Sequence, residues 1–542
     1  MQLKAVAVPS LPKLAWVAEV HRKSGVVFLQ HGSSVEIQED FFIEGVWNGA
    51  FENGNFGETD CVFGTGAILG DTSIRFITSA STVDCLYYAE SAIGITVSNS
   101  LSLILAYRDD ALDPRCQEFP SICDSFLEGI DGYRRDIPTV KGRIRRQMYR
   151  NLDVFGDRIS ESDKRMPPRF QSFEDYRNYR RDNYALIAAN ARDASRTHQL
   201  EIWSTQSKGY DTTSINAMAG IHGLDKVFTV TTAKSKIHLV HNDEGKSPDD
   251  DGTEICNALG LKCIPINRRA FTESFDEEYL YYCARHHNQD VNLKEINSHI
   301  TNPGVLLTGV HGEILCANDP FVDPPLMADS TIKRLDVAGH GLAELRLVVG
   351  FIQLPVPFIG ARRKADIVKI TESAEMDPWR LRNDYDRPIA RRIAEEAGVP
   401  RHMFGQSKMG SVVIFHLPSI PYGKTLRREF FQYLADEKIM GRYRTIMWPI
   451  VRWVNSILML KSEQRFALVH YAERVISKVR RRQFQFKLLW SHLEGALFCF
   501  CVNQTAEKYR WEVSEFPLSE RTRNITSSHV HKARRHDAVA SH

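Results

Sequence analysis

Short apolar segments separated by polar residues fill the first 125 positions of the chain. Four of them have the length and the β-branched content of strands, at residues 15–20, 26–29, 74–78 and 93–97. Clusters of glycine, asparagine and aspartate, such as the one at 53–57, separate these segments. The pattern predicts a layered, β-rich domain over residues 1–125.

From about residue 173, helical and strand periodicities alternate. The predicted order is helix 173–196, strand 200–204, helix 213–221, strand 226–232, helix 252–259, strand 262–266 and strand 304–308. Strands that alternate with helices favour a mostly parallel sheet covered on both faces. We therefore expect an α/β domain over 176–420, joined to the β-rich domain by a polar and basic connecting segment with a few strands over 126–175.

Aromatic residues recur at helical spacing beyond residue 420, and basic residues outnumber acidic ones there. This pattern predicts a helical C-terminal extension over 421–519, in which most aromatics form a core. Docking of these helices to an acidic partner or a membrane surface is an alternative role. Residues 520–542 are polar and predict a disordered tail.

Composition is that of a globular protein with several domains. The chain has 542 residues, a formal net charge of +2, 43% hydrophobic and 25% charged residues, which gives no indication of nucleic-acid binding. The 10 cysteines form no CxxC pair, so we expect reduced thiols and a cytoplasmic location. We expect neither a signal peptide nor a transmembrane segment.

One loop has the composition of a phosphate cradle. The strand at 200–204 leads into Ser207, Lys208, Gly209, Tyr210, Asp211, Thr212 and Thr213, and a helix follows. Backbone N–H groups, hydroxyls and a helix N-terminus all favour a bound anion at such a place. Because the Asp211 carboxylate would repel a phosphate, its presence implies a Mg²⁺ ion between them.

This run resembles the Ser-Gly-Gly-x-Asp-Ser signature of the N-type ATP pyrophosphatases, and more narrowly of the asparagine synthetase family. Such enzymes split ATP into AMP and pyrophosphate and adenylate a carboxylate that an amine then attacks. The resemblance implies that residues 207–213 bind ATP and that Asp211 binds Mg²⁺. Lys208 stands where the family has its first glycine, so the backbone loses the glycine's freedom to adopt a positive φ.

Two later segments resemble landmarks of the same family. Residues 306–315 resemble the strand-ending Thr-Gly-Asp-Gly-Gly-Asp-Glu-Leu stretch, which implies that Glu313 is a metal-binding and catalytic carboxylate. Val310 and Ile314 replace acidic residues of that stretch. Residues 406–410 resemble the Arg-x-Lys-x-Gly element, which implies that Lys408 stabilises charge on the reacting phosphate.

Residues 78–88 and 96–105 resemble a late part of the glutaminase half of asparagine synthetases. The resemblance implies an Ntn-like, amidotransferase-like N-terminal domain, followed by a parallel-sheet ATP pyrophosphatase domain of the adenine nucleotide alpha hydrolase-like type. Glutamine hydrolysis in that class needs a cysteine after the initiator methionine, where this chain has Gln2. We therefore expect no glutaminase activity.

Together these features predict an ATP-dependent carbon–nitrogen ligase that forms an amide through an acyl-adenylate, with ATP and Mg²⁺ as cofactors. Its expected partners are a small-molecule or peptide carboxylate and either free ammonia or an internal amine, with a homo-oligomer as a further possibility. Intramolecular amide formation, as in β-lactam synthetases and lasso-peptide cyclases, is one alternative. A catalytically degenerate nucleotide-binding or scaffold protein is the other.

Overall fold

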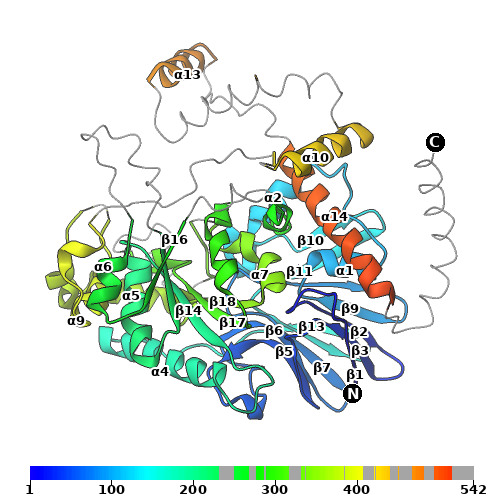
Figure 1. The fold of residues 1–542 in the computed structure, drawn as a ribbon, viewed down its shortest axis with the longest axis horizontal. Coiled ribbons are helices and arrows are strands. Elements are labelled where there is room, and N and C mark those ends of the chain that lie inside the picture. The colour runs from blue at the N-terminus through cyan, green and yellow to red at the C-terminus, as the bar shows by residue number, and fades with distance from the viewer. Residues whose placement is uncertain are drawn as a thin grey trace.

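The computed structural model describes residues 1–230, 250–267, 276–285, 289–316, 331–335, 337–383, 385–406, 420–421, 423–439, 450, 467–480 and 493–515. Its strands form three sheets, two in the N-terminal β-rich region and one in the α/β region that follows (Figure 1). The mixed α/β architecture predicted from the sequence is confirmed at this level.

The first two sheets belong to the β-rich region. The first has the order β1(Gln2–Ala7), β3(Val26–His31), β2(Trp16–His21), β9(Gly94–Ser98), β8(Leu86–Glu90), β11(Gly142–Gln147) and β10(Asp136–Thr139). The second has the order β13(Arg158–Ser162), β12(Asn151–Phe155), β7(Ser73–Ile77), β6(Val62–Leu69), β5(Phe41–Trp47) and β4(Glu36–Ile37). The four strands β10 to β13 come from the predicted connecting segment, so a large part of that segment belongs to these sheets.

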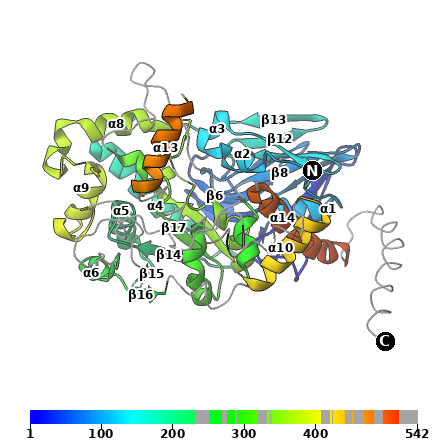
Figure 2. The ribbon, with the colours of Figure 1, turned by 90° about the horizontal axis from the view of Figure 1, so that it is seen from above.

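An apolar core lies between the first and second sheets. Trp16 of β2 packs edge-on against Phe42 of β5 at 5.0 Å and stacks on Phe76 of β7 at 6.2 Å. Because strand residues alternate between two faces, the other face of each sheet also needs a cover. The first sheet is covered by α1(Leu101–Tyr107), and α14(Glu494–Glu515) packs along α1 (Figures 1 and 2).

The remaining helices of this side are α2(Phe119–Asp124), α3(Gly129–Gly132) and α10(Lys424–Asp436), and α13(Ala467–Arg480) is a further helix of the C-terminal part. Cys499 and Cys501 of α14 are buried, as expected for small apolar residues. All ten cysteines lie in the described residues, and none forms a disulfide. Within the described ranges, no helix combines the length and the apolar character needed to cross a membrane.

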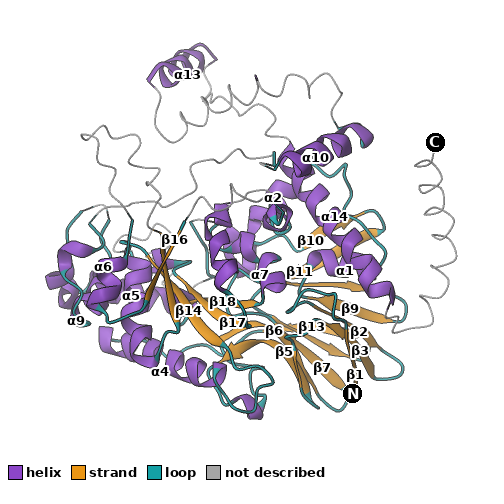
Figure 3. Ribbon diagram, viewed as in Figure 1, coloured by secondary structure: helices purple, strands orange, loops and turns teal. Residues whose placement is uncertain are grey.

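The third sheet is parallel throughout. Its order is β16(Cys263–Ile266), β15(Lys226–Val230), β14(Glu201–Gln206), β17(Gly304–Thr308) and β18(Phe351–Pro355). Its helices are α4(Phe173–Ala191), α5(Tyr210–Ala219), α6(Thr253–Ala258), α7(Leu345–Val349), α8(Lys364–Glu372) and α9(Pro388–Glu396) (Figure 3). The α4 helix begins with a capping box in which the Ser172 side chain accepts from the Asp175 backbone.

Buried charges join the α/β region to the β-rich region. The Arg346 guanidinium of α7 donates to both carboxylate oxygens of Glu44 on β5, at 2.7 and 3.0 Å, and to Asp84 at 2.6 Å. Burial raises the pKa of Asp84 to about 6 although the Arg346 charge opposes this. Since removing one partner of a buried pair leaves an uncompensated charge, this cluster holds β18 and α7 against the second sheet.

Candidate nucleotide site at the switch point of the parallel sheet

The order of the third sheet defines one place where neighbouring loops diverge. From the central strand β14 the chain builds β15 and β16 on one side, and it later builds β17 and β18 on the other. The switch point therefore lies between β14 and β17, beyond the carboxyl ends of the strands. Ligands of open parallel sheets bind in this position. The loops that leave β14 and β17 there are residues 207–209 and 309–311.

The loop after β14 is held by hydrogen bonds among its own residues. The Ser207 N–H donates to Thr212 Oγ1 at 3.0 Å, and the Gly209 N–H donates to Ser207 Oγ at 3.1 Å. Thr213 Oγ1 donates to the Gly209 carbonyl at 2.8 Å. The hydroxyls of the predicted cradle thus fold the chain back onto the first turn of α5, where the helix dipole favours an anion.

Lys208 occupies this loop without a left-handed backbone. Its φ is not positive, so the glycine of the family is not required for the path that the chain takes here. The Lys208 N–H donates to the carboxylate of Asp250 at 2.9 Å, and its carbonyl accepts from the Gly405 N–H at 2.8 Å. Both ends of the residue are therefore fixed by segments that are distant in sequence.

Aromatic and basic residues from the region of α9 pack over the start of α5. The Tyr210 ring lies 5.0 Å from the Tyr385 ring, and Tyr210 Oη is hydrogen-bonded to the Arg391 guanidinium at 2.6 Å. The Tyr385 hydroxyl hydrogen-bonds to the Tyr210 backbone, and burial raises its pKa. A Cβ at Gly405 would lie 2.4 Å from the Tyr210 ring, so glycine is needed for this close packing.

Asp211 is the point at which the two loops meet. A Cβ on Gly312 would lie 2.1 Å from Asp211 Oδ1, and one on Gly309 would lie 2.7 Å from the Asp211 Cβ. Only glycine at these positions lets the loop after β17 approach α5 so closely. The Asp211 carboxylate is ion-paired with Arg387, whose side chain is 6% exposed against 25% for Asp211.

Glu313 lies on the loop after β17 and is buried. Its Oε1 is within 3.2 Å of His311 Nδ1 and accepts from the Leu335 N–H at 3.2 Å. Burial alone would raise the pKa of this carboxyl, but the hydrogen bond and charge of His311 and the charge of Arg334 hold it well below its usual range. His311 itself has a φ of 69°, a left-handed conformation that is strained for a residue with a side chain.

The structure brings most of the predicted site residues to one place. Ser207 to Thr213 surround the start of α5, and the loop that carries Glu313 contacts Asp211 through its glycines. Lys408 lies outside the described residues. Reasoning from sequence missed Arg387, Asp250 and Tyr385, of which only Asp250 left a signal, as part of an acidic run at 249–251.

The donor set suits a magnesium ion held mainly by a nucleotide. Mg²⁺ commonly takes one or two protein carboxylates and completes its shell with phosphate oxygens and water. Asp211 and Glu313 can supply two such groups, although Arg387 and His311 engage them here. In the described part of the chain, no group of three or more His, Cys, Asp or Glu side chains forms a metal site independent of a ligand.

No protein-family model matches this chain, and no curated protein matches it. The functional interpretation therefore rests on the geometry of the switch point and on the residues that form it.

Proposed function

We propose that this protein is an ATP-dependent ligase that forms an amide through an acyl-adenylate and releases AMP and pyrophosphate. The observation that carries the proposal is the position of the Ser207–Thr213 loop at the switch point of the parallel sheet, at the N-terminus of α5. The dipole of α5 and the loop hydroxyls at that position favour binding of the nucleotide's phosphates, which would replace the internal acceptors of the Ser207, Lys208 and Gly209 N–H groups.

Each residue has a role in this proposal. Ser207, Lys208, Gly209, Thr212 and Thr213 hold the pyrophosphate part of ATP, and Tyr210 fixes the start of the helix through Arg391. A Mg²⁺ ion held by Asp211 and Glu313 would neutralise phosphate charge. Lys408 stabilises charge that develops on the reacting phosphate. Arg387, already beside Asp211, is a further cation close to where phosphates would lie.

The thiols of the β-rich region support a ligase without glutaminase activity. Cys61 and Cys85 are buried, and burial raises the pKa of both thiols, that of Cys85 to about 12. A thiol needs a lowered pKa to act as a nucleophile at neutral pH. The amine would therefore be free ammonia or a group on the substrate, as in β-lactam synthetases or lasso-peptide cyclases.

Pyrophosphate release tests the proposal. The full-length protein is incubated with Mg-ATP and a panel of carboxylates, each with and without ammonium, with Asp211→Asn as the inactive control. We expect pyrophosphate and AMP to appear with at least one carboxylate and to be absent with the variant. Release of ADP instead of AMP, or no release with any acid, would contradict a ligase of this type.

A second candidate is a nucleotide-binding protein without chemistry. Both carboxylates of the site are engaged by cations of the same chain, Asp211 by Arg387 and Glu313 by His311. In this case Mg-ATP raises the melting temperature, while no carboxylate in the panel releases pyrophosphate. The two measurements together separate the candidates.

A further inference from the structure

A polar pocket lies at the junction of the β-rich region and α4, away from the switch point. It has a volume of about 620 Å³, within the range of roughly 300–1,000 Å³ that small-molecule sites occupy. Three segments line it: the connection from β5 to β6, residues 165–168, and α4. Its polar and charged lining residues include Asn48, Asn55, Glu58, Thr59, Asp60, Arg165 and Asn183.

Asp60 supplies a buried carboxylate to this pocket. The residue is 8% exposed, and one oxygen accepts from the Tyr179 hydroxyl at 2.8 Å. The other oxygen has a weak partner, the Cys61 thiol, at 3.8 Å, and the carboxylate also accepts from the backbone N–H of Asp60 itself. A carboxylate accepts about four hydrogen bonds, so Asp60 retains capacity for a donor group that enters the pocket. Burial raises its pKa, which indicates that its negative charge lacks full compensation.

Among the other polar groups of the pocket, the Asn55 amide and the Arg165 guanidinium offer donors, while Asn183 Nδ2 donates to the Tyr179 carbonyl at 2.7 Å. Asn48 Nδ2 donates to Asn183 Oδ1, while Thr59 Oγ1 donates to Asn48 Oδ1, each at 2.5 Å. Asn55 Oδ1 accepts from the Trp47 indole at 3.1 Å, which leaves the Asn55 amide N–H groups for a ligand. Arg165 is exposed at the pocket and carries a guanidinium suited to a carboxylate.

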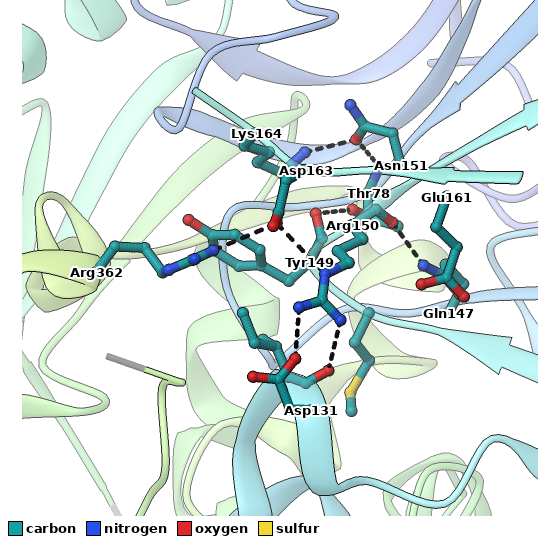
Figure 4. Close-up of polar contacts among 12 residues, drawn as sticks. Thr78, Asp131, Gln147, Tyr149, Arg150, Asn151, Glu161, Asp163, Lys164 and Arg362 are labelled. Atoms are coloured by element: carbon teal, nitrogen blue, oxygen red, sulfur yellow. Dashed lines mark hydrogen bonds and ion pairs between the residues drawn. The ribbon is translucent and has the colours of Figure 1, made fainter. Parts of the chain in front are cut away.

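Lys164 lies behind the pocket and is fully enclosed. Figure 4 shows its ammonium directed at the Asn151 carboxamide, with a distance of 2.7 Å between Nζ and Oδ1. Burial lowers its pKa to about 7, although the charges of Asp60 and Asp163 raise it, while Arg75 lowers it further. The adjacent Asp163 pairs with Arg362 and Arg150 on its outer side (Figure 4). Because this pKa is near neutral pH and the Asp60 charge raises it, the Lys164 ammonium should lose its proton more readily when another cation approaches Asp60.

We propose that this pocket binds a free amino acid, with its ammonium group on Asp60 and its carboxylate at Arg165. The Asp60 carboxylate calls for a donor group and the Arg165 guanidinium for an acceptor, and a zwitterion supplies both. The amides of Asn48, Asn55 and Asn183 and the Glu58 carboxylate also line the pocket. The ligand would bridge the β-rich region and α4, and its binding requires neither ATP nor ligase activity.

Calorimetric titration of the full-length protein tests this site. Glycine, L-alanine, L-aspartate and L-glutamine are titrated beside ethylamine and propionate, each of which has one of the two charged ends. We expect at least one amino acid to bind at least tenfold more tightly than either single-ended compound. Failure of all four amino acids to bind, or equal binding of ethylamine or propionate, would overturn the proposal.

Variants locate the ligand. Asp60→Asn and Arg165→Ala should each weaken amino-acid binding by tenfold or more, and Arg165 is exposed enough that its replacement leaves the fold intact. Arg158→Ala is the matched control, because Arg158 lines a different pocket between β8 and β13. Unchanged affinity in Arg165→Ala, or a comparable loss in Arg158→Ala, would contradict the assignment.

Proton release provides an independent readout. An ammonium group on Asp60 should lower the pKa of Lys164 further, so binding at pH 7 should release up to roughly half a proton. Titrations in buffers of different ionisation enthalpy measure this release, and Lys164→Met should abolish it. Binding without proton release in the unmodified protein would place the ligand away from Asp60 and would contradict the proposal.

Discussion

The two loops at the switch point of the third sheet differ in how they are built. The loop after β14 is polar, and its hydroxyls bond to its own backbone around the start of α5. The loop after β17 is shaped by two glycines, carries the apolar residues Val310 and Ile314, and retains one buried carboxylate, Glu313. The first loop has hydroxyls at a helix N-terminus, with the N–H groups of Ser207, Lys208 and Gly209 hydrogen-bonded within the protein. The second loop packs closely against Asp211 and carries one buried carboxylate.

Under the proposed function, this difference makes anion binding and metal binding separable. Phosphate recognition would then depend on the loop after β14, and metal binding on Asp211, against which Gly309 and Gly312 of the second loop lie closely. Substitutions in the two loops should therefore affect ATP binding and its dependence on Mg²⁺ differently.

Asp211→Asn should have the largest effect. It leaves the Arg387 guanidinium buried without its partner, which should cost about 3 kcal/mol of stability in the protein without nucleotide. It should also remove the magnesium-dependent part of ATP binding. Chemical denaturation measures the first effect and ATP titration with and without Mg²⁺ measures the second.

Asp377→Asn is the control for this substitution, because Asp377 pairs with Arg380 but is 53% exposed. An exposed pair contributes little to stability, so this variant should be close to wild type. Equal losses of stability in Asp211→Asn and Asp377→Asn would show that burial of the Arg387–Asp211 pair does not determine its contribution to stability.

Gly312→Ala should have the next largest effect. The added methyl group would lie 2.1 Å from Asp211 Oδ1, so the Asp211 carboxylate must leave its position beside Arg387 or the loop must shift, at a cost of about 2 kcal/mol. We expect weaker magnesium-dependent ATP binding together with a lower melting temperature. Gly70→Ala is the matched control, since its nearest atom is Ser73 Oγ at 3.2 Å in an exposed turn. Normal Mg-ATP binding by Gly312→Ala would contradict a role for the close contact between the second loop and Asp211.

Glu313→Gln should lower stability most at neutral pH and progressively less in acid. The pKa of Glu313 is lower in the folded protein than in the unfolded chain, so its ionisation contributes stability above about pH 4.3 that is lost on acidification. The difference in unfolding free energy between wild type and variant should therefore shrink as the pH falls below 4.3. If the difference in unfolding free energy were constant with pH, ionisation of Glu313 would not contribute to stability.

Lys208→Gly should have the smallest effect on stability. Since Lys208 does not use a positive φ, glycine relieves no strain there and costs about 0.5–1 kcal/mol through backbone entropy. If the ammonium group contacts phosphate, Lys208→Met should weaken ATP binding as much as Lys208→Gly. A loss confined to the glycine variant would assign the effect to the backbone.

The sequence predicted the elements whose signals are local. The apolar run at 304–308 became β17 with those bounds, and the polar loop before α5 lies where the motif placed it. The start of α5 was predicted at residue 213 but lies at Tyr210, because Gly209 is the N-cap and Tyr210 packs against Tyr385 and Arg391. That packing is tertiary and leaves no periodic pattern.

The residues that complete the site were not predictable for the same reason. Arg387 reaches Asp211 from a segment 176 residues away, and the left-handed conformation of His311 arises from the fold rather than from its residue type. Likewise, the participation of β10 to β13 in both sheets depends on pairing with distant strands. Strand pairing over such separations is not encoded in local propensity.

The most direct test of the account is a calorimetric titration of the full-length protein with Mg-ATP, repeated without Mg²⁺ and with Asp211→Asn. We predict saturable binding of Mg-ATP to the unmodified protein, weaker binding of ATP without the metal, and no response to Mg²⁺ in the variant. Absence of binding by the unmodified protein, or an undiminished effect of Mg²⁺ in Asp211→Asn, would contradict the assignment of the loop after β14 as a nucleotide site.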